Sequence, residues 1–127
     1  MKLRFDKNSL RLRLKKSDME KLRNDQSITE TIPFPHGTFT YSLTIAPQQP
    51  AVSALVEDQS IKVILPPALA LHWMNSNEVG IYHTIPADAN NQLDLLIEKD
   101  FPCKEINEED QQDYFTPDDV PVPPNLC

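Results

Sequence analysis

The chain is short of glycine and cysteine, and it has no long hydrophobic run. Its 127 residues include two glycines and two cysteines, Cys103 and Cys127. So few glycines cannot supply a glycine-rich loop for a nucleotide phosphate, and the two cysteines form no CxxC pair for zinc or redox chemistry. No apolar run approaches the roughly 18 residues of a membrane helix, and residues 1–6 lack the continuous apolar stretch of a signal peptide. The sequence therefore predicts a cytoplasmic protein of one domain's size, without a membrane partner.

Basic side chains are scarce outside the first part of the chain. The formal net charge is -7. Residues 1–50 hold nine Lys/Arg and five Asp/Glu. Residues 51–97 hold one Lys/Arg and five Asp/Glu, and residues 98–127 hold two Lys/Arg and nine Asp/Glu. The candidate residues for binding an anion or a partner are Arg4, Arg11, Arg13, Lys15 and Lys16. Because a net negative charge opposes DNA binding, nucleic acid is not the expected partner. We expect these cations to be solvated or to meet the chain's own acidic tail.

Two stretches share one pattern about 51 residues apart. "LRFDKNSLRLRLKKSDMEKLRNDQSIT" (3–29) aligns without a gap on "ALVEDQSIKVILPPALALHWMNSNEVG" (54–80). Both contain apolar residues at every second position, which is typical of a half-buried strand. The polar triplets at 6–8 and 57–59 indicate hairpin turns.

A short helix follows in each copy. Ser17 is the expected N-cap of the first helix, and Glu20 completes a capping box. Pro66-Pro67 marks the start of the second helix, where a missing N–H costs little. The apolar face of the second helix is expected to hold Leu69, Trp73 and Met74.

Two more strands complete each half. They are expected at 28–34 and 38–45, and at 79–85 and 92–98, with a one-residue insertion before the last. The predicted fold class is α+β: a mostly antiparallel β barrel or closed sandwich from two pseudo-symmetric ββαββ repeats, 1–46 and 52–100, with two short helices. The two repeats would form a single domain, followed by an acidic, proline-rich tail at 101–127. The shared core is predicted to contain Leu10, Leu12, Leu14, Ile61, Val63, Leu65 and Trp73.

The second half resembles the swapped-hairpin domain of the AbrB/SpoVT regulators and related antitoxins. The resemblance is carried by "SIKVILPPALALHWMNSNEVGIYHTI" (60–85) and "NQLDLLIEKD" (91–100), with Leu65-Pro66 and Glu78-Val79 at the family's characteristic steps. It implies that two units interlock into a barrel, here as a pseudo-dimer within one chain.

The whole chain resembles a small uncharacterised bacterial family of about this length. The shared motifs are "KLRFDKNSLRLRLKKSDME", "NEVG", "LLIEKDFPC" and "EEDQQDYFTPD". This resemblance implies a bacterial cytoplasmic protein and no particular activity.

The tail combines carboxylates with aromatic residues. Phe101, Tyr114 and Phe115 are predicted to anchor it on the folded part, because a purely disordered tail carries fewer aromatics. Its acids do not match a calcium loop, so no metal is expected there. These acids are Glu108, Glu109, Asp110 and Asp113.

No catalytic signature is present, and neither an enzyme nor a cofactor is expected. A pair of Cys103 and His83 could form across adjacent strands, but nothing in the sequence orients it. The favoured hypothesis is a non-catalytic interaction module with an unknown protein partner, acting as a monomer (a pseudo-dimer) or a homodimer. The alternatives are a swapped-hairpin regulator that binds nucleic acid through the basic first repeat, and a small enzyme or metal carrier using Cys103 or the tail acids.

Overall fold

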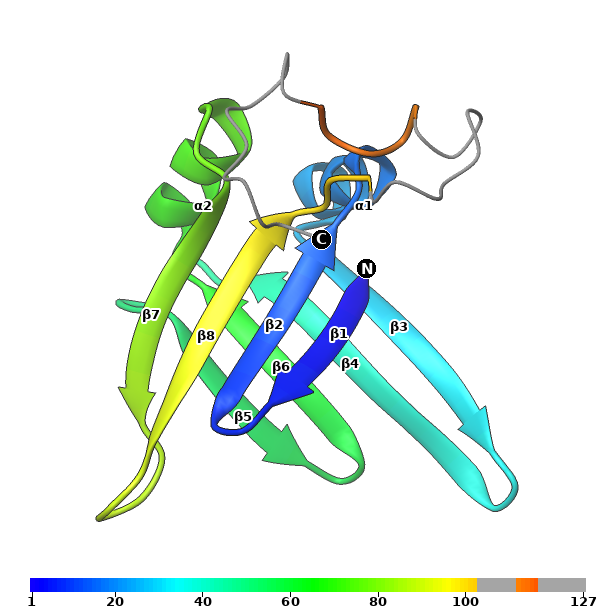
Figure 1. Cartoon of the computed structure of the whole chain (residues 1–127), viewed down its shortest axis with the longest axis vertical. Coiled ribbons are helices and arrows are strands. Elements are labelled where there is room, and N and C mark those ends of the chain that lie inside the picture. The colour runs from blue at the N-terminus through cyan, green and yellow to red at the C-terminus, as the bar shows by residue number, and fades with distance from the viewer. Residues whose placement is uncertain (103–111, 117–127) are drawn as a thin grey trace.

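A computed structural model describes residues 1–102 and 112–116, as an α+β structure of two four-stranded sheets and two helices (Figure 1). The first half forms β1 (Lys2–Asp6), β2 (Ser9–Leu14), α1 (Lys16–Asp25), β3 (Ser27–Phe34) and β4 (Gly37–Ile45). The second half forms β5 (Ser53–Glu57), β6 (Ser60–Leu65), α2 (Pro67–Asn75), β7 (Gly80–Pro86) and β8 (Gln92–Lys99). The predicted element order is confirmed in both halves.

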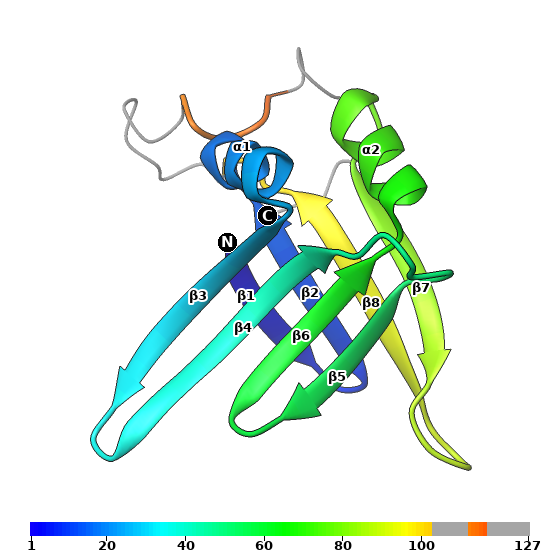
Figure 2. The same cartoon turned by 180° about the vertical axis from the view of Figure 1, so that it is seen from behind.

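Each sheet takes one hairpin from each half of the chain. Sheet A has the order β1-β2-β8-β7, and sheet B has the order β3-β4-β6-β5. The hairpin pairs are antiparallel, whereas the central pairs β2–β8 and β4–β6 are parallel. The expected barrel is wrong, because no described strand of one sheet pairs with a strand of the other. The sheets instead face one another in a sandwich-like arrangement (Figure 2).

The strand register differs from the sequence alignment of the two halves. Leu10 lies opposite Leu95 in sheet A, and Ile61 lies opposite Tyr41 in sheet B. Tyr41 and Leu95 therefore hold equivalent positions in the two halves. The sequence alignment, with its one-residue insertion, pairs Leu95 with Leu43 instead. A shift of two residues keeps the same side chains facing inward, because side chains alternate along a strand.

The core lies between the two sheets. All seven residues predicted for it are buried in one cluster, which confirms that expectation. Leu43, Leu95 and Ile97 from the last strand of each half complete it. The Trp73 indole N–H also donates to the carbonyl oxygen of Val79 at 3.1 Å, so its polar atom is satisfied.

The start of α1 was predicted wrongly. Lys15 is the N-cap, and Asp18 accepts a hydrogen bond from the Lys15 N–H at 3.0 Å. Ser17 lies inside the helix, and Glu20 is exposed. Ser17 does not cap the helix because it already lies in the first turn, and its hydroxyl donates to Asp113, far along the chain.

The start of α2 agrees with the sequence, but its apolar face does not. Pro66 is the N-cap and Pro67 is the first helical residue. Ala70 and Trp73, three residues apart, form the buried face. Leu69 is exposed, so its predicted place on that face is wrong.

The two ends of the sandwich differ. Both helices and residues 112–116 lie at one end, which we call the helix end. All four hairpin turns lie at the opposite end, the turn end, as both views show (Figures 1 and 2).

Candidate functional site

A buried carboxylate organises the basic residues on the outer face of sheet A. Arg11 and Arg13 project from β2 beside Glu98 of β8, whose side chain is 5% exposed. The Nε atoms of Arg11 and Arg13 lie 2.8 Å and 3.9 Å from Glu98 Oε1, as ion pairs without hydrogen-bond alignment. The Tyr82 hydroxyl donates to Glu98 Oε2 at 2.8 Å. Burial and the Glu98 carboxylate together raise the pKa of Tyr82 to about 12. This network compensates part of the charge of Arg11 and Arg13, because one carboxylate faces two guanidinium groups.

Gly80 makes room for this network. A Cβ atom built at Gly80 would lie 2.7 Å from the Ile97 carbonyl oxygen, 2.9 Å from Glu98 Cγ and 3.0 Å from the Tyr82 hydroxyl. Real Cβ atoms essentially never lie closer than 3.0 Å to such atoms, so a side chain at Gly80 would force the Ile97 backbone or the Glu98 side chain to shift. The absence of a side chain here lets Glu98 and Tyr82 meet across β7 and β8.

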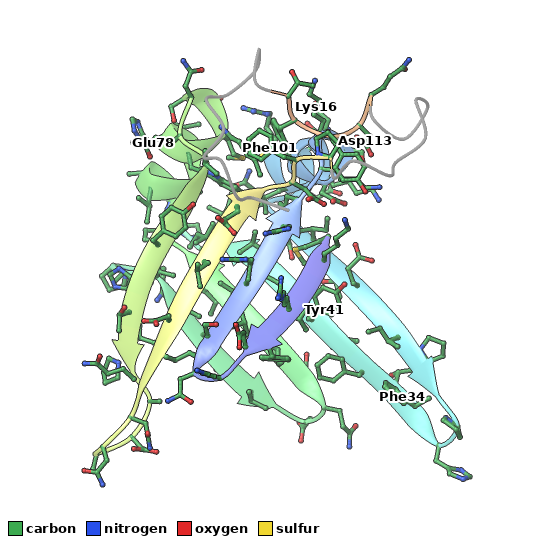
Figure 3. The ribbon with its side chains drawn as sticks, viewed as in Figure 1. Lys16, Phe34, Tyr41, Glu78, Phe101 and Asp113 are labelled. Carbon is green, nitrogen blue, oxygen red and sulfur yellow. The ribbon has the colours of Figure 1, made fainter. Side chains whose placement is uncertain are left out.

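Residues 112–116 pack against the helix end through Asp113. Its carboxylate accepts hydrogen bonds from the Ser17 N–H at 2.9 Å and from the Ser17 hydroxyl at 2.6 Å, and it lies 3.6 Å from Lys15 Nζ. The Asp113 carbonyl accepts the Lys16 N–H at 2.9 Å. Figure 3 labels both residues, which lie near one another at the helix end. Burial alone would raise the pKa of Asp113, but the bonds from Ser17 and the charge of Lys15 outweigh it, so the pKa lies below its ordinary value.

The three aromatic residues predicted as tail anchors are all buried. Phe115 lies 6.2 Å from Phe101 between ring centroids, and its N–H donates to the Asp100 carbonyl at 2.9 Å. Tyr114 has Lys2 Nζ 5.1 Å and Lys15 Nζ 5.7 Å from its ring centroid. Apolar contact and cations over a ring both hold this short segment in place.

Lys2 joins the charged cluster, although the sequence did not single it out. Its Nζ lies 3.1 Å from Asp100 Oδ2 and 3.4 Å from the Tyr114 hydroxyl. Burial lowers the pKa of Lys2, but Asp100 and Tyr114 outweigh it, so the pKa is raised. Asp100 is only 1% exposed and would be a costly buried charge without a cation.

The five predicted cations therefore do not form one free surface. Arg11 and Arg13 pair with Glu98 of β8 and with no described residue of the tail, whereas Lys15 pairs with Asp113. Arg4 is exposed on β1, and no described residue forms an ion pair with it. Lys16 has partners of its own at the helix end.

A second feature lies at the turn end, where the inner faces of the two sheets enclose an apolar groove of about 350 Å³. Its lining includes side chains from β1, β2, β5, β6, β7 and β8: Phe5, Leu10, Val56, Ile61, Ile85 and Leu93. Phe5 is 57% exposed and Val56 is 78% exposed. Large apolar side chains gathered in one hollow mark an interaction surface more strongly than scattered ones do.

Acidic residues outnumber basic ones in the turns around the apolar groove. Asp6 lies beside Lys7 in the β1–β2 hairpin, Glu57 and Asp58 lie in the β5–β6 hairpin, and Asp88 lies in the β7–β8 loop. Glu57 has Lys62 Nζ at 3.8 Å. Hydrogen bonds from the Asn91 side chain and the Asn90 N–H lower the pKa of Asp88, which keeps it charged.

The sites considered for metal or covalent chemistry are not assembled in the described part of the chain. Within residues 1–102 and 112–116, no three His, Cys, Asp or Glu side chains gather as a metal site. His83 is exposed on β7, whereas Cys103 and the acids Glu108, Glu109 and Asp110 lie outside the described residues.

Comparison with known proteins gives a family. A model described as a family of unknown function, DUF7009, matches residues 1–119. The chain belongs to this family. No curated protein and no solved structure matches the DUF7009 chain. None of its described helices has the length and apolar character needed to cross a bilayer.

Sequence reasoning missed the apolar groove and the role of Glu98. Phe5 and Val56 continue the alternation of the core positions, so they were expected to face inward, and they do line the inner face. Nothing local indicates that the sheets leave a hollow there. The signal in the sequence that could have identified a partner for Arg11 and Arg13 is Glu98. It is an acidic residue at the end of an otherwise apolar strand.

Proposed function

We propose that this DUF7009 chain is a non-catalytic protein-binding module and that the apolar groove is its binding surface. The observation that carries the proposal is the exposure of Phe5 and Val56 in one hollow at the turn end. Fully burying a Val or Phe side chain contributes about 1.5–3 kcal/mol. Covering the exposed part of Phe5 and Val56 contributes a fraction of this, which adds to the burial of the partner's own apolar side chains and is offset by the cost of association.

The acidic turns specify the chemistry of the partner. Asp6, Asp58 and Asp88 surround an apolar hollow on a chain whose net charge is -7. A partner segment with apolar side chains and flanking Lys or Arg complements both features. Charge complementarity of this kind mainly raises the association rate and selects partners, whereas apolar burial supplies most of the affinity.

The same proposal takes the protein to be cytoplasmic and bacterial, and its two halves to be repeats of one ancestral unit. The repeated element order and the exchange of hairpins between the sheets support the repeat. It acts as a monomer, the pseudo-dimer, or as a homodimer.

The binding surface can be mapped with a model peptide in a ¹H–¹⁵N correlation titration. The probe is acetyl-Lys-Val-Lys-Val-Lys-Val-Lys-amide, with its Glu-for-Lys counterpart as the charge control. We expect the Lys peptide to shift the amide signals of Phe5, Val56 and Leu93, and the Glu peptide to bind at least tenfold more weakly. Shifts confined to the helix end would place binding elsewhere and refute the proposal.

Two matched variants separate apolar from purely electrostatic binding. Val56→Asp puts a charge into the groove, and Leu71→Asp puts the same charge on α2, where Leu71 is 56% exposed. Each substitution adds one negative charge, so long-range attraction alone would tighten binding of the Lys peptide to both. We expect Val56→Asp to weaken it about tenfold, which corresponds to about 1.4 kcal/mol, and Leu71→Asp to leave it within twofold of wild type.

A second candidate function is nucleic-acid binding through the outer face of sheet A. The hairpin exchange favours it, because it matches the interlocking that the AbrB/SpoVT resemblance implies. The pairing of Arg11 and Arg13 with Glu98 weighs against it. A fluorescence-anisotropy titration with duplex DNA in 150 mM salt is the test, and sequence-dependent sub-micromolar binding would favour this second candidate over the first.

A further inference from the structure

The four edge strands of the two sheets are not equally protected against pairing with another chain. β1 carries Lys2 and Arg4, β3 contains Pro33, and β7 ends in Pro86. Charged residues, above all lysine, and prolines are the usual devices that keep an edge strand unpaired. β5 reads "SALVE": it has no proline and no basic residue, and its one acid, Glu57, is next to the turn.

The backbone of β5 offers hydrogen-bonding groups to the outside. The two-residue turn Asp58-Gln59, with φ of 45° and 50°, is flanked by the pair Glu57 and Ser60. In such a hairpin the flanking pair is hydrogen-bonded, and the bonded pairs then alternate. The N–H and C=O groups of Ala54 and Val56 therefore point away from β6.

The side chains of the same two residues point into the apolar groove. Ala54 and Val56 both line it, together with Ile85 on β7, the edge strand of the other sheet. The free backbone of β5 and the exposed hollow thus lie side by side at the turn end.

We propose that the partner's segment binds in an extended conformation, as a strand added to the edge of β5. Its backbone pairs with Ala54 and Val56, and every second side chain enters the apolar groove, as in strand addition generally. Its basic residues face the acidic turns that contain Asp58 and Asp88. This inference rests on the proposed function and specifies how the groove is used.

The charge on the chain favours a different protein over a second copy as the occupant. Two copies would each bring a net charge of -7 and the same acidic turns to the interface. Like charges disfavour that association, whereas a basic segment is attracted to the groove.

Amide hydrogen exchange, read residue by residue by NMR, tests the added strand. At saturating Lys-Val peptide, the Ala54 and Val56 amides of the full chain should exchange at least tenfold more slowly. The control is Thr29 and Thr31 on the edge strand β3, whose outward amides should be unchanged. Their outward direction follows from the β3–β4 turn, where Phe34 pairs with Gly37.

Each result decides something different. Peptide-induced shifts around the groove without slower exchange at Ala54 and Val56 would overturn strand addition and leave the proposed function standing. No binding at the groove would overturn both. Protection of Ala54 and Val56 that rises with protein concentration in the absence of peptide would identify a second copy as the occupant, and would also overturn the inference.

Discussion

Replacing Glu98 by Gln should destabilise the fold measurably, because it leaves two cations on sheet A without their carboxylate. Arg11 Nε is 2.8 Å and Arg13 Nε 3.9 Å from Glu98 Oε1, and the guanidinium side chains are 31% and 13% exposed. Glutamine keeps the shape of the side chain and an oxygen acceptor for the Tyr82 hydroxyl. With that oxygen toward Tyr82, the amide NH2 faces Arg11 Nε, so the change removes the charge and places a donor against a donor.

The size of the effect follows from burial and geometry. Removing one partner of a fully buried ion pair costs about 3–5 kcal/mol. Water reaches Arg11, and the ion pairs lack hydrogen-bond alignment, so we expect about 2–3 kcal/mol for Glu98→Gln. For a chain of this length that is a fall in Tm of about 6–10 °C.

Urea denaturation followed by circular dichroism measures this loss. Tyr82→Phe is the matched control, because it removes only the hydroxyl that donates to Glu98 and should cost about 1 kcal/mol. A Glu98→Gln protein within about 0.5 kcal/mol of wild type would show that solvent already stabilises Arg11 and Arg13. The reasoning that Glu98 withdraws them from external anions would then be wrong.

Three further perturbations address the core, the glycine and the 112–116 segment. Leu12→Ala removes a side chain buried between the sheets and should cost about 2–5 kcal/mol in urea denaturation; a value below 1 kcal/mol would contradict its place in the core. Gly80→Ala forces a Cβ atom against the Ile97 carbonyl and should cost about 1–3 kcal/mol, whereas a Tm equal to wild type would mean that β7 and β8 can separate there freely. Asp113→Asn should cost about 1 kcal/mol at neutral pH. Because the pKa of folded Asp113 lies below its usual 3.8, this difference should persist above that pH and vanish as pH falls through the lowered pKa, and a constant difference at all pH values would refute the assignment.

The strands and the core could be predicted from the sequence because their signal is local and periodic. Alternating residues such as Leu10, Leu12 and Leu14 define one inward face whatever the strand pairs with. The same rule explains why the two-residue error in aligning β4 with β8 did not change which side chains were predicted to face the core. Strand order and the choice between a barrel and a sandwich depend on contacts between distant segments, which periodicity does not contain.

The errors at α1 and in the charged network have the same origin. Ser17 fits a capping pattern locally, but the helix begins at Lys16, with the Asp18 side chain accepting the N–H of the N-cap Lys15, and Ser17 bonds to Asp113 from within the first turn. The charge distribution predicted that the basic strand meets the acidic end of the chain. It could not show that Arg11 and Arg13 would pair with Glu98 within the sheet, while Lys15 pairs with Asp113.

The most direct test of the proposed binding surface is the heat-capacity change when the Lys-Val peptide binds, from calorimetric titrations at several temperatures. Burial of apolar surface in the groove predicts a clearly negative value for the wild type and Leu71→Asp, and a less negative value for Val56→Asp. Binding should also persist in part at 0.5 M salt, since apolar burial is not screened. A heat-capacity change near zero in all three proteins, with affinity abolished by salt, would contradict the apolar groove as the site of binding.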